Sequence, residues 1–292
     1  MTALPGAAAE AGAAGGRSRA RRLLRTVPAY IGLIVIAALV LVPFAWMVSS
    51  SLKRDNQVFS VPIQWIPDEL RWQNFVEIWE RIPLLTYLGN SAFLSVTITA
   101  LQVLTGSFAA YGFSKVRFPG RDGLFLAYIA TIAVPWQAYM VPQYIMMQRA
   151  ELTDTFWSII LLQAFSAFGV FLMRQYYMSI PDDLCEAARI DGLSEYGIYR
   201  RIMLPLSKPA LASLALLTFV NTWNDYMGPF IYLTSNELWT VQLGLRSFVG
   251  QYEAEYAMIM TGSVLSVLPI LVIFLFGQRF FIRGIATSGL KG

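Results

Sequence analysis

The sequence predicts an all-α, polytopic membrane protein with six transmembrane helices. Of its 292 residues, 56% are hydrophobic and 14% are charged, and the mean hydropathy is +0.53. Soluble domains carry roughly 25% charged residues, so this chain is suited to an apolar solvent. Its apolar residues form runs close to or above the roughly 20 residues that a helix needs to cross a hydrocarbon core of about 30 Å. A charged loop, residues 179–205, lies between the fourth and fifth runs.

The first predicted span follows a basic tail. Residues 1–16 are rich in alanine and glycine, and five arginines follow between Arg17 and Arg25. We therefore predict a disordered basic tail over residues 1–26. The uncharged run Val27–Val48 exceeds the apolar region of a signal peptide, which has about 7–15 residues. We expect a retained helix there, opening a membrane domain over residues 27–292.

Five further apolar runs complete the predicted set of spans. They are Gly89–Phe113, Leu124–Met147, Phe156–Tyr177, Ala210–Leu233 and Ala257–Phe281. Several contain proline or glycine, which membrane helices tolerate where neighbouring helices or a water-lined cavity satisfy the freed backbone groups. We therefore expect the spans to pack around a cavity.

The basic residues are distributed unevenly across the predicted spans. Sixteen of the 22 lysines and arginines fall on the side of the N-terminus, and six fall on the opposite side. Basic residues accumulate on the cytoplasmic side of membrane proteins. The pattern predicts that both termini and the loop at 179–205 face the cytoplasm. The net charge of +4 reflects this bias and does not indicate nucleic-acid binding.

The composition argues against a membrane enzyme. The chain has no histidine, the commonest general base and metal ligand. Its one cysteine, Cys185, can form no internal disulfide and has no histidine to activate it, so we assign it a structural role and expect no metal site. The sequence lacks a G-x-x-x-x-G-K-[ST] phosphate loop, so no ATP binding is expected on this chain.

The charged loop at 179–205 is predicted to form two short helices that meet at a glycine. Ser179 is a candidate cap for the first helix, and Pro181 suits its first turn. Gly192 suits the left-handed residue that ends a helix, so the first helix should end near Asp191. The second helix should begin at Ser194 and end before the fifth span.

Eight residues of this loop stand at a specific spacing: Glu186, Ala187, Ala188, Asp191, Gly192, Ile202, Leu204 and Pro205. This spacing resembles the cytoplasmic signature loop of permease subunits of bacterial ABC importers. The resemblance implies a coupling loop between helices 4 and 5 that docks the permease onto an ATP-hydrolysing subunit. We expect Ala187 and Ala188 to give a flat face for close approach. Without the resemblance, an ordinary capped helical loop explains the same residues.

Further motifs look like those of carbohydrate importer permeases of the maltose-system G-subunit type. They include Arg174-Gln175-Tyr176-Tyr177, Lys208-Pro209-Ala210-Leu211 and Thr222-Trp223-Asn224-Asp225. The resemblance covers residues 27–292, although the stretch from Gly284 to Gly292 departs from the family in several positions. It implies a bacterial cytoplasmic-membrane importer for a sugar, in particular a di- or oligosaccharide. It also implies a second permease, ATP-hydrolysing subunits that hold ATP and Mg²⁺, an extracytoplasmic sugar-binding protein and surrounding lipid as partners.

A polar and aromatic cluster in the fifth predicted span is the first candidate substrate path. It comprises Asn221, Trp223, Asn224, Asp225 and Tyr226, and Trp136 and Gln137 form a second candidate lining in the third span. Sugars offer hydroxyls to amides and carboxylates and C–H faces to aromatic rings. By helical spacing, the two asparagines and Asp225 should share a face toward the permease pair, with Trp223 pointing elsewhere, toward the interface belt. A polar helix end with an outward acid is the alternative interpretation.

Other transport functions remain open at this level. The same architecture could import another solute, such as a phosphorylated polyol or an amino acid. A proton-coupled carrier or channel is less favoured, because the spans lack relays of buried acids and bases. The resemblance does not decide which of the two permeases makes the main sugar contacts.

Overall fold

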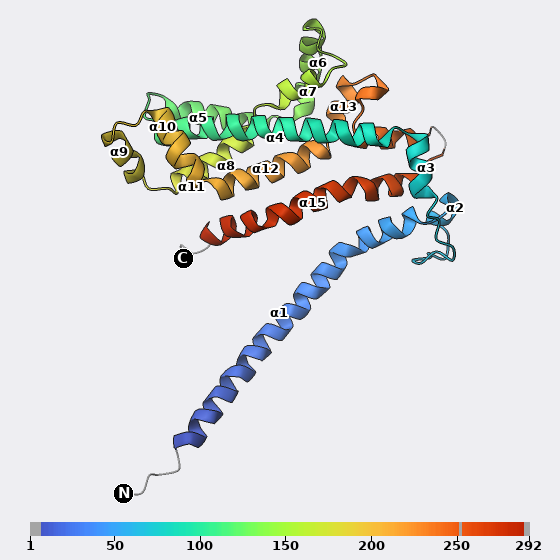
Figure 1. The fold of residues 1–292 in the computed structure, drawn as a ribbon, viewed down its shortest axis with the longest axis horizontal. Helices are drawn as coiled ribbons and strands as arrows, with labels where there is room; N and C mark the ends of the chain where they lie inside the picture. Colours follow the sequence, from blue (N-terminus) through green and yellow to red (C-terminus); the bar gives the residue numbers. More distant parts are fainter. Residues whose placement is uncertain (1–6, 251–252, 289–292) are drawn as a thin grey trace.

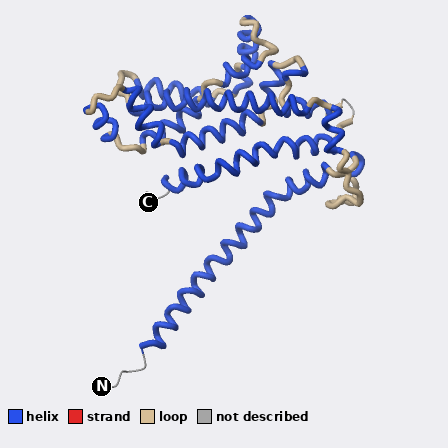
Figure 2. Tube along the Cα trace, in the orientation of Figure 1, coloured by secondary structure: helices blue, strands red, loops and turns tan. Residues whose placement is uncertain are grey.

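The computed structural model describes residues 7–250 and 253–288, which are helical apart from turns, loops and an isolated bridge between Val249 and Ala254 (Figures 1 and 2). Four segments of these residues are long and apolar enough to cross a membrane, and a bent pair raises the number to five. The four are Pro28–Ser51, Leu84–Lys115, Phe156–Met178 and Tyr256–Gln278. The pair joins 195–206 to 208–223 through a bend of 79°. The expected multi-span, all-α class is therefore confirmed.

The first helix diverges from the helical bundle. Helix α1 (Ala7–Ser51) contacts α15 (Tyr256–Ser288) and then diverges from it. Every side chain from 28 to 45 is exposed, so α1 needs lipid or another subunit to cover it. The backbone of α1 is helical through most of the segment expected to be a disordered tail, while residues 1–6 lie outside the described part. A separate tail over 1–26 stays a prediction.

Helix α4 (Leu84–Lys115) is the centre of the bundle and packs on α8 (Ala167–Met178) and α12 (Lys208–Trp223). Two glycines bring α4 and α8 together: a Cβ atom on Gly106 would lie 3.5 Å from the backbone carbon of Gly169. Small residues at such crossings let membrane helices approach closely, which strengthens van der Waals packing.

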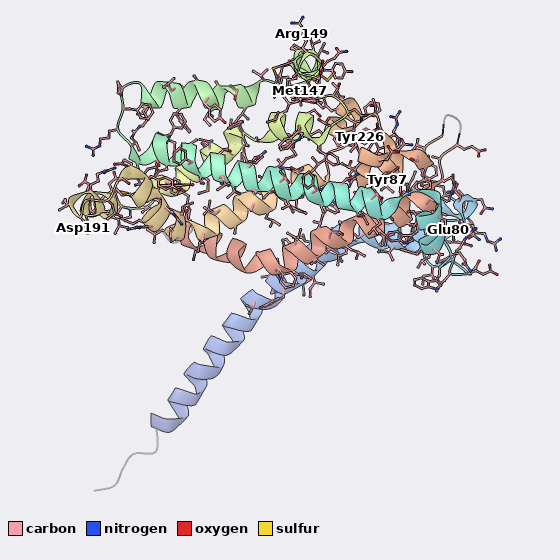
Figure 3. The ribbon with its side chains drawn as sticks, turned by 45° about the horizontal axis from the view of Figure 1, so that its top comes forward. Glu80, Tyr87, Met147, Arg149, Asp191 and Tyr226 are labelled. Carbon is pink, nitrogen blue, oxygen red and sulfur yellow. The ribbon has the colours of Figure 1, made fainter. Side chains whose placement is uncertain are left out.

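The expected third span, Leu124–Met147, is wrong as a continuous helix. The chain forms α5 (Arg121–Ala130), two 3₁₀ turns within 131–138, and α6 (Met140–Arg149). Pro135 explains the interruption, because it donates no hydrogen bond and forces the preceding Val134 into an extended conformation, with φ −84° and ψ 113°. Helix α6 projects away from the bundle, with Arg149 near its tip (Figure 3).

The fourth and fifth spans are also interrupted. Helix α7 (Phe156–Gln163) ends three residues before α8, and the Ser166 hydroxyl accepts a hydrogen bond from the Gly169 amide at 3.1 Å to start α8. Helix α12 ends at Trp223, and α13 (Met227–Tyr232) follows after residues 224–226. The expected fifth span, Ala210–Leu233, is therefore two helices rather than one.

The two ends of the bundle carry different short helices. One end holds α9, α10 and α11 of the charged loop, and the other holds α2 and α3. Figure 3 shows Asp191 and Glu80 at these opposite ends. The helices near the second end are α2 (Asp55–Val58), α3 (Asn74–Arg81), η4 (Asn236–Leu238), α14 (Val241–Gly244) and η5 (Leu245–Phe248). Buried Asn74 fixes this end by donating to the carbonyls of Ser51 and Lys53, each at 2.9 Å.

Candidate functional site

The charged loop folds as a helix, a glycine turn and a second helix. Helix α9 (Asp183–Ile190) ends before Gly192, whose φ of +82° confirms the predicted left-handed residue. The Leu193 amide donates to the Ala188 carbonyl at 3.0 Å and closes the turn. A second helical segment follows as α10 (Glu195–Ile198), a π-helical turn at 199–203 and α11 (Leu204–Leu206).

Two local predictions about this loop need correction. Ser179 does not cap α9, because its hydroxyl donates to the Tyr176 carbonyl at 2.7 Å and belongs to the end of α8. Ala188 is 5% exposed and packs in the core, so the expected flat face consists of Ala187 without Ala188. Ser194 does cap the second segment, accepting from the Gly197 amide at 3.2 Å.

Most of the residues expected to dock lie on the exposed surface of the loop. Glu186, Ala187, Asp191, Gly192 and Pro205 are exposed, and Ile202 and Leu204 are partly buried. Within the described part of the chain, the Glu186 carboxylate has one weak ion-pair partner, Arg117, at 3.8 Å. Both side chains are more than half exposed, and such pairs contribute little to stability. Glu186 is therefore available to another subunit.

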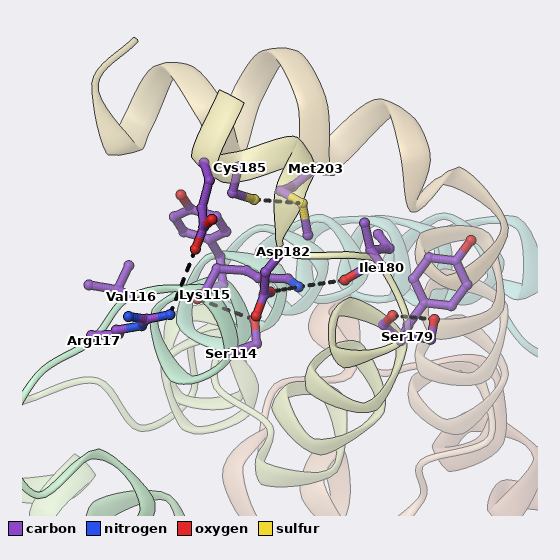
Figure 4. A network of polar contacts seen from close by, with 12 residues as sticks. Ser114, Lys115, Val116, Arg117, Ser179, Ile180, Asp182, Cys185 and Met203 are labelled. Atoms are coloured by element: carbon purple, nitrogen blue, oxygen red, sulfur yellow. Dashed lines mark hydrogen bonds and ion pairs between the residues drawn. The ribbon is translucent and has the colours of Figure 1, made fainter. Parts of the chain in front are cut away.

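A buried lysine ties α9 to the end of α4 (Figure 4). The Lys115 ammonium donates to the Ile180 carbonyl at 2.6 Å and to Asp182 Oδ1 at 2.5 Å. This bond holds the pKa of Asp182 below its usual value. Arg189 adds a second tie, because its guanidinium donates to the Lys115 carbonyl and to Glu195. The loop and α4 thus form one hydrogen-bonded unit.

Cys185 lies inside this unit. Its side chain is 1% exposed and its sulfur lies 3.8 Å from that of Met203. Burial raises the pKa of the thiol, which keeps it protonated and unreactive. These observations support the structural role that the sequence indicates.

The candidate path residues of the fifth span do not share one face. Asp225 lines a pocket of about 370 Å³, whereas Asn221 and Asn224 are exposed outside it. Trp223 is 2% exposed, and its Nε1 donates to the Ser266 carbonyl at 3.1 Å. Trp223 lies outside the pocket that Asp225 lines and packs against α15, so its expected place in the interface belt is wrong. The end of α12 at Trp223 breaks the helical spacing on which the shared face depended.

The second candidate lining is divided in the same way. Trp136 borders the pocket with Asp225, while Gln137 is exposed outside it. Tyr226 also lies outside the pocket and stacks on Phe230 with ring centroids 5.5 Å apart. Two amides that the sequence reasoning passed over, Gln102 and Gln163, complete the polar lining. The sequence could have indicated both residues, since each is an amide within an otherwise apolar run.

Comparison with known proteins agrees with this architecture. Residues 102–287 match the family described as binding-protein-dependent transport system inner membrane component. An arabinooligosaccharides transport system permease protein of Halalkalibacterium halodurans is 34% identical over 265 residues, which cover 90% of this chain and 95% of the relative. A lactose transport system permease protein of Rhizobium radiobacter is 31% identical over 268 residues, with 92% and 97% covered. An sn-glycerol-3-phosphate transport system permease protein of Yersinia pestis is 33% identical over 268 residues, with 89% and 95% covered.

A solved structure gives the same fold. The crystal structure of a bacterial ABC transporter involved in the import of the acidic polysaccharide alginate contains a chain that superposes with a TM-score of 0.76. The match covers 90% of this chain and 98% of that one, at 24% identity. Fold and sequence thus define a multi-pass inner-membrane transport component. The chain belongs to the family of binding-protein-dependent ABC transporter permeases, in which the ATPase is a separate subunit.

Proposed function

We propose that this permease forms, with a second permease subunit, the path by which a neutral sugar enters a bacterial cell. The observation that carries the proposal is the lining of the 370 Å³ pocket. Its described residues include aromatic rings, amides and one carboxylate, and none of them is a lysine or arginine. Relatives named for arabinooligosaccharide and lactose transport support a saccharide substrate, in particular a di- or oligosaccharide.

A phosphorylated polyol is the competing substrate class, because a similar relative is named for sn-glycerol-3-phosphate transport. Phosphate binding sites typically use arginine, lysine or backbone N–H groups. The Asp225 carboxylate in this pocket would repel a phosphate. The charge of the lining therefore favours the neutral sugar.

The arrangement across the membrane follows from the same reasoning. We propose six crossings, with the interrupted α5–α6 segment counted as one, and both termini in the cytoplasm. The excess of basic residues on the side of the coupling loop (residues 179–205) supports this orientation. In this orientation α2 and α3, which lie at the other end of the bundle, would be on the outer face, where an extracytoplasmic sugar-binding protein would deliver its cargo.

The coupling loop is proposed to dock on the ATP-hydrolysing subunit. Among the residues that the structure describes, exposed Glu186 has only the weak partner Arg117, so a basic residue of the ATPase can replace it. ATP and Mg²⁺ would bind on that subunit, and its closure would move the loop and rock the helices between inward- and outward-open states.

Uptake by the whole complex tests the proposed substrate class. The permease pair, its ATPase and its binding protein would be reconstituted into vesicles, and uptake of labelled oligosaccharides would be compared with that of labelled glycerol phosphate. We expect ATP-dependent uptake of the sugar. Preferential uptake of the phosphorylated polyol would refute the proposed substrate class.

A variant of the loop tests docking. Glu186→Ala should reduce copurification of the ATPase or uncouple ATP hydrolysis from uptake, because it leaves a desolvated basic group of the ATPase unpaired. Arg117→Ala is the matched control, since it removes the internal partner and leaves Glu186 free to dock. Normal assembly and uptake by Glu186→Ala would contradict the docking proposal.

A further inference from the structure

Three helix interruptions meet at the 370 Å³ pocket. The α5–α6 interruption supplies Trp136 and Tyr139, the α7–α8 interruption supplies Ser166 beside Gln163, and the α12–α13 interruption supplies Asp225. These segments are far apart in the sequence, yet every one of them breaks where it borders the same space. The coincidence is a property of the tertiary structure.

Interruptions within proposed membrane-spanning segments require an explanation. Backbone groups without helical partners are costly in hydrocarbon and are tolerated where they are buried in protein or line a water-filled cavity. In membrane transporters, discontinuous helices commonly form the substrate site. The convergence of three interruptions therefore marks the pocket as a place where polar groups are kept for a ligand.

The carboxylate in the pocket is held in a fixed position. Asp225 Oδ2 accepts a hydrogen bond from Gln163 Nε2 at 2.8 Å, and Oδ1 accepts from the Gly228 amide at 3.1 Å. Gln102 Nε2 donates to the Gln163 carbonyl at 2.7 Å, and its own Oε1 accepts from the Thr218 hydroxyl at 3.1 Å. This chain of bonds links α4, α7 and α12 and orients the carboxylate before any ligand arrives.

The aromatic side of the pocket is also anchored. Trp136 Nε1 donates to Gln143 Oε1 at 3.0 Å, which fixes the indole ring at the edge of the space. Each carboxylate oxygen of Asp225 has a further lone pair available to sugar hydroxyls. A ring that offers an apolar face to the indole and hydroxyls to the carboxylate would satisfy both sides.

We propose that this subunit itself supplies a saccharide subsite at the point where its three interrupted helices meet, and that Asp225 selects neutral sugar rings over anionic ones. The inference rests on the proposed sugar-import function and goes further, because it assigns sugar contacts to this permease rather than to its partner alone. Gln163 acts as a positioning residue that holds Asp225, and Trp136 provides the stacking surface. A side chain of the second permease is the other possible occupant, and the experiment separates the two.

The first test uses the reconstituted complex with a transported oligosaccharide. Asp225→Asn and Trp136→Ala should each raise the KM for uptake about tenfold, the effect of losing one good polar or stacking contact. Glu237→Gln and Trp157→Ala are matched controls, because they remove an acid and an indole that lie outside the pocket, and their KM should equal that of the wild type. Asp225→Asn should also allow inhibition by a uronic or phosphorylated sugar that does not inhibit the wild type.

The second test does not depend on transport rates. Asp225→Cys would be treated with a water-soluble thiol reagent in the complex, where the native Cys185 is 1% exposed and should not react. We expect labelling that the oligosaccharide slows and that glycerol phosphate does not.

The outcomes distinguish this inference from the proposed function. If the wild type imports sugar while the pocket variants keep its KM and the cysteine is not protected, the subsite is refuted and the sugar importer stands. A cysteine that never reacts would show that the second permease fills the pocket, which also overturns the subsite. If the wild type imports no sugar at all, both proposals fail.

Discussion

The ammonium group of Lys115 lies 2.5 Å from Asp182 Oδ1, although the Lys115 side chain is only 2% exposed. The two residues are 67 positions apart, so the contact joins the end of α4 to the start of α9. Helix α4 is also the helix on which α8 and α12 pack. A movement of the coupling loop would therefore be transmitted to the bundle through the contact with α4 as well as through the covalent chain into α12.

Lys115→Met is expected to loosen the coupling loop. The ion pair alone is worth about 0–1 kcal/mol, because Asp182 is 65% exposed. The unpaired Ile180 carbonyl adds about 1–3 kcal/mol. Hydrogen exchange of the α9 amides should accelerate about tenfold or more, and uptake per ATP hydrolysed should fall. Lys208→Met, at an exposed lysine of α12, should change neither quantity, and equal exchange in the two variants would contradict the tie.

Substitutions at Gly192 should follow backbone conformation rather than size. A Cβ atom there would meet no atom of the described residues within 4 Å, so the φ of +82° is what penalises a side chain. Gly192→Val should cost about 1–3 kcal/mol and reduce docking of the ATPase, whereas Gly192→Asn should be milder because asparagine tolerates the left-handed region. Copurification of the ATPase with each variant measures the difference. Equal losses for valine and asparagine would show that contact with the partner, not backbone strain, decides the position.

Asp154→Asn is expected to release the loop that follows α13. The Asp154 carboxylate accepts from the Ser235 hydroxyl and from the amides of Thr234 and Ser235. The Ser235 hydroxyl is the largest cause of the fall in the pKa of Asp154 to about 2. Because this value lies below the roughly 3.9 of an unfolded aspartate, the stabilisation is complete above about pH 4 and is lost as the pH falls through about 2.

At neutral pH the Asp154→Asn variant should therefore lose about 1–2 kcal/mol of local stability. Hydrogen exchange of the Thr234 and Ser235 amides measures this loss directly. Asp68→Asn, at an exposed aspartate, is the control. Unchanged protection at 234–235 would disprove the clamp.

Trp223→Phe tests the packing between α12 and α15. Phenylalanine keeps most of the buried ring but loses the donation to Ser266, at a cost of about 1 kcal/mol. Trp223→Ala should cost about 3–5 kcal/mol, because it also leaves a cavity. The thermal inactivation midpoint of the purified complex reports both. Trp157→Phe, at an indole that is 58% exposed, should change the stability by less than about 0.5 kcal/mol. Its midpoint should therefore stay close to that of the wild type.

Local signals explain the parts of the site that were predicted correctly. The conformation of Gly192 and the start of the second helix at Ser194 depend on neighbours within a few residues, so sequence spacing was sufficient for them. The cap at Ser179 was assigned to the wrong helix, because a serine between two helices suits either the end of one or the start of the next, and only the distance to the Tyr176 carbonyl decides.

Long-range packing decided the rest. The sequence by itself determined that the chain is an all-helical membrane protein with a glycine-hinged loop, because apolar run length, basic-residue bias and short motifs are local properties. It could not show that Asp225 and Trp136 border one pocket while Asn224 and Gln137 lie outside it. Helical spacing predicts a shared face only while the helix continues, and the interruptions at 131–139, 164–166 and 224–226 become a site only when the tertiary structure brings them together.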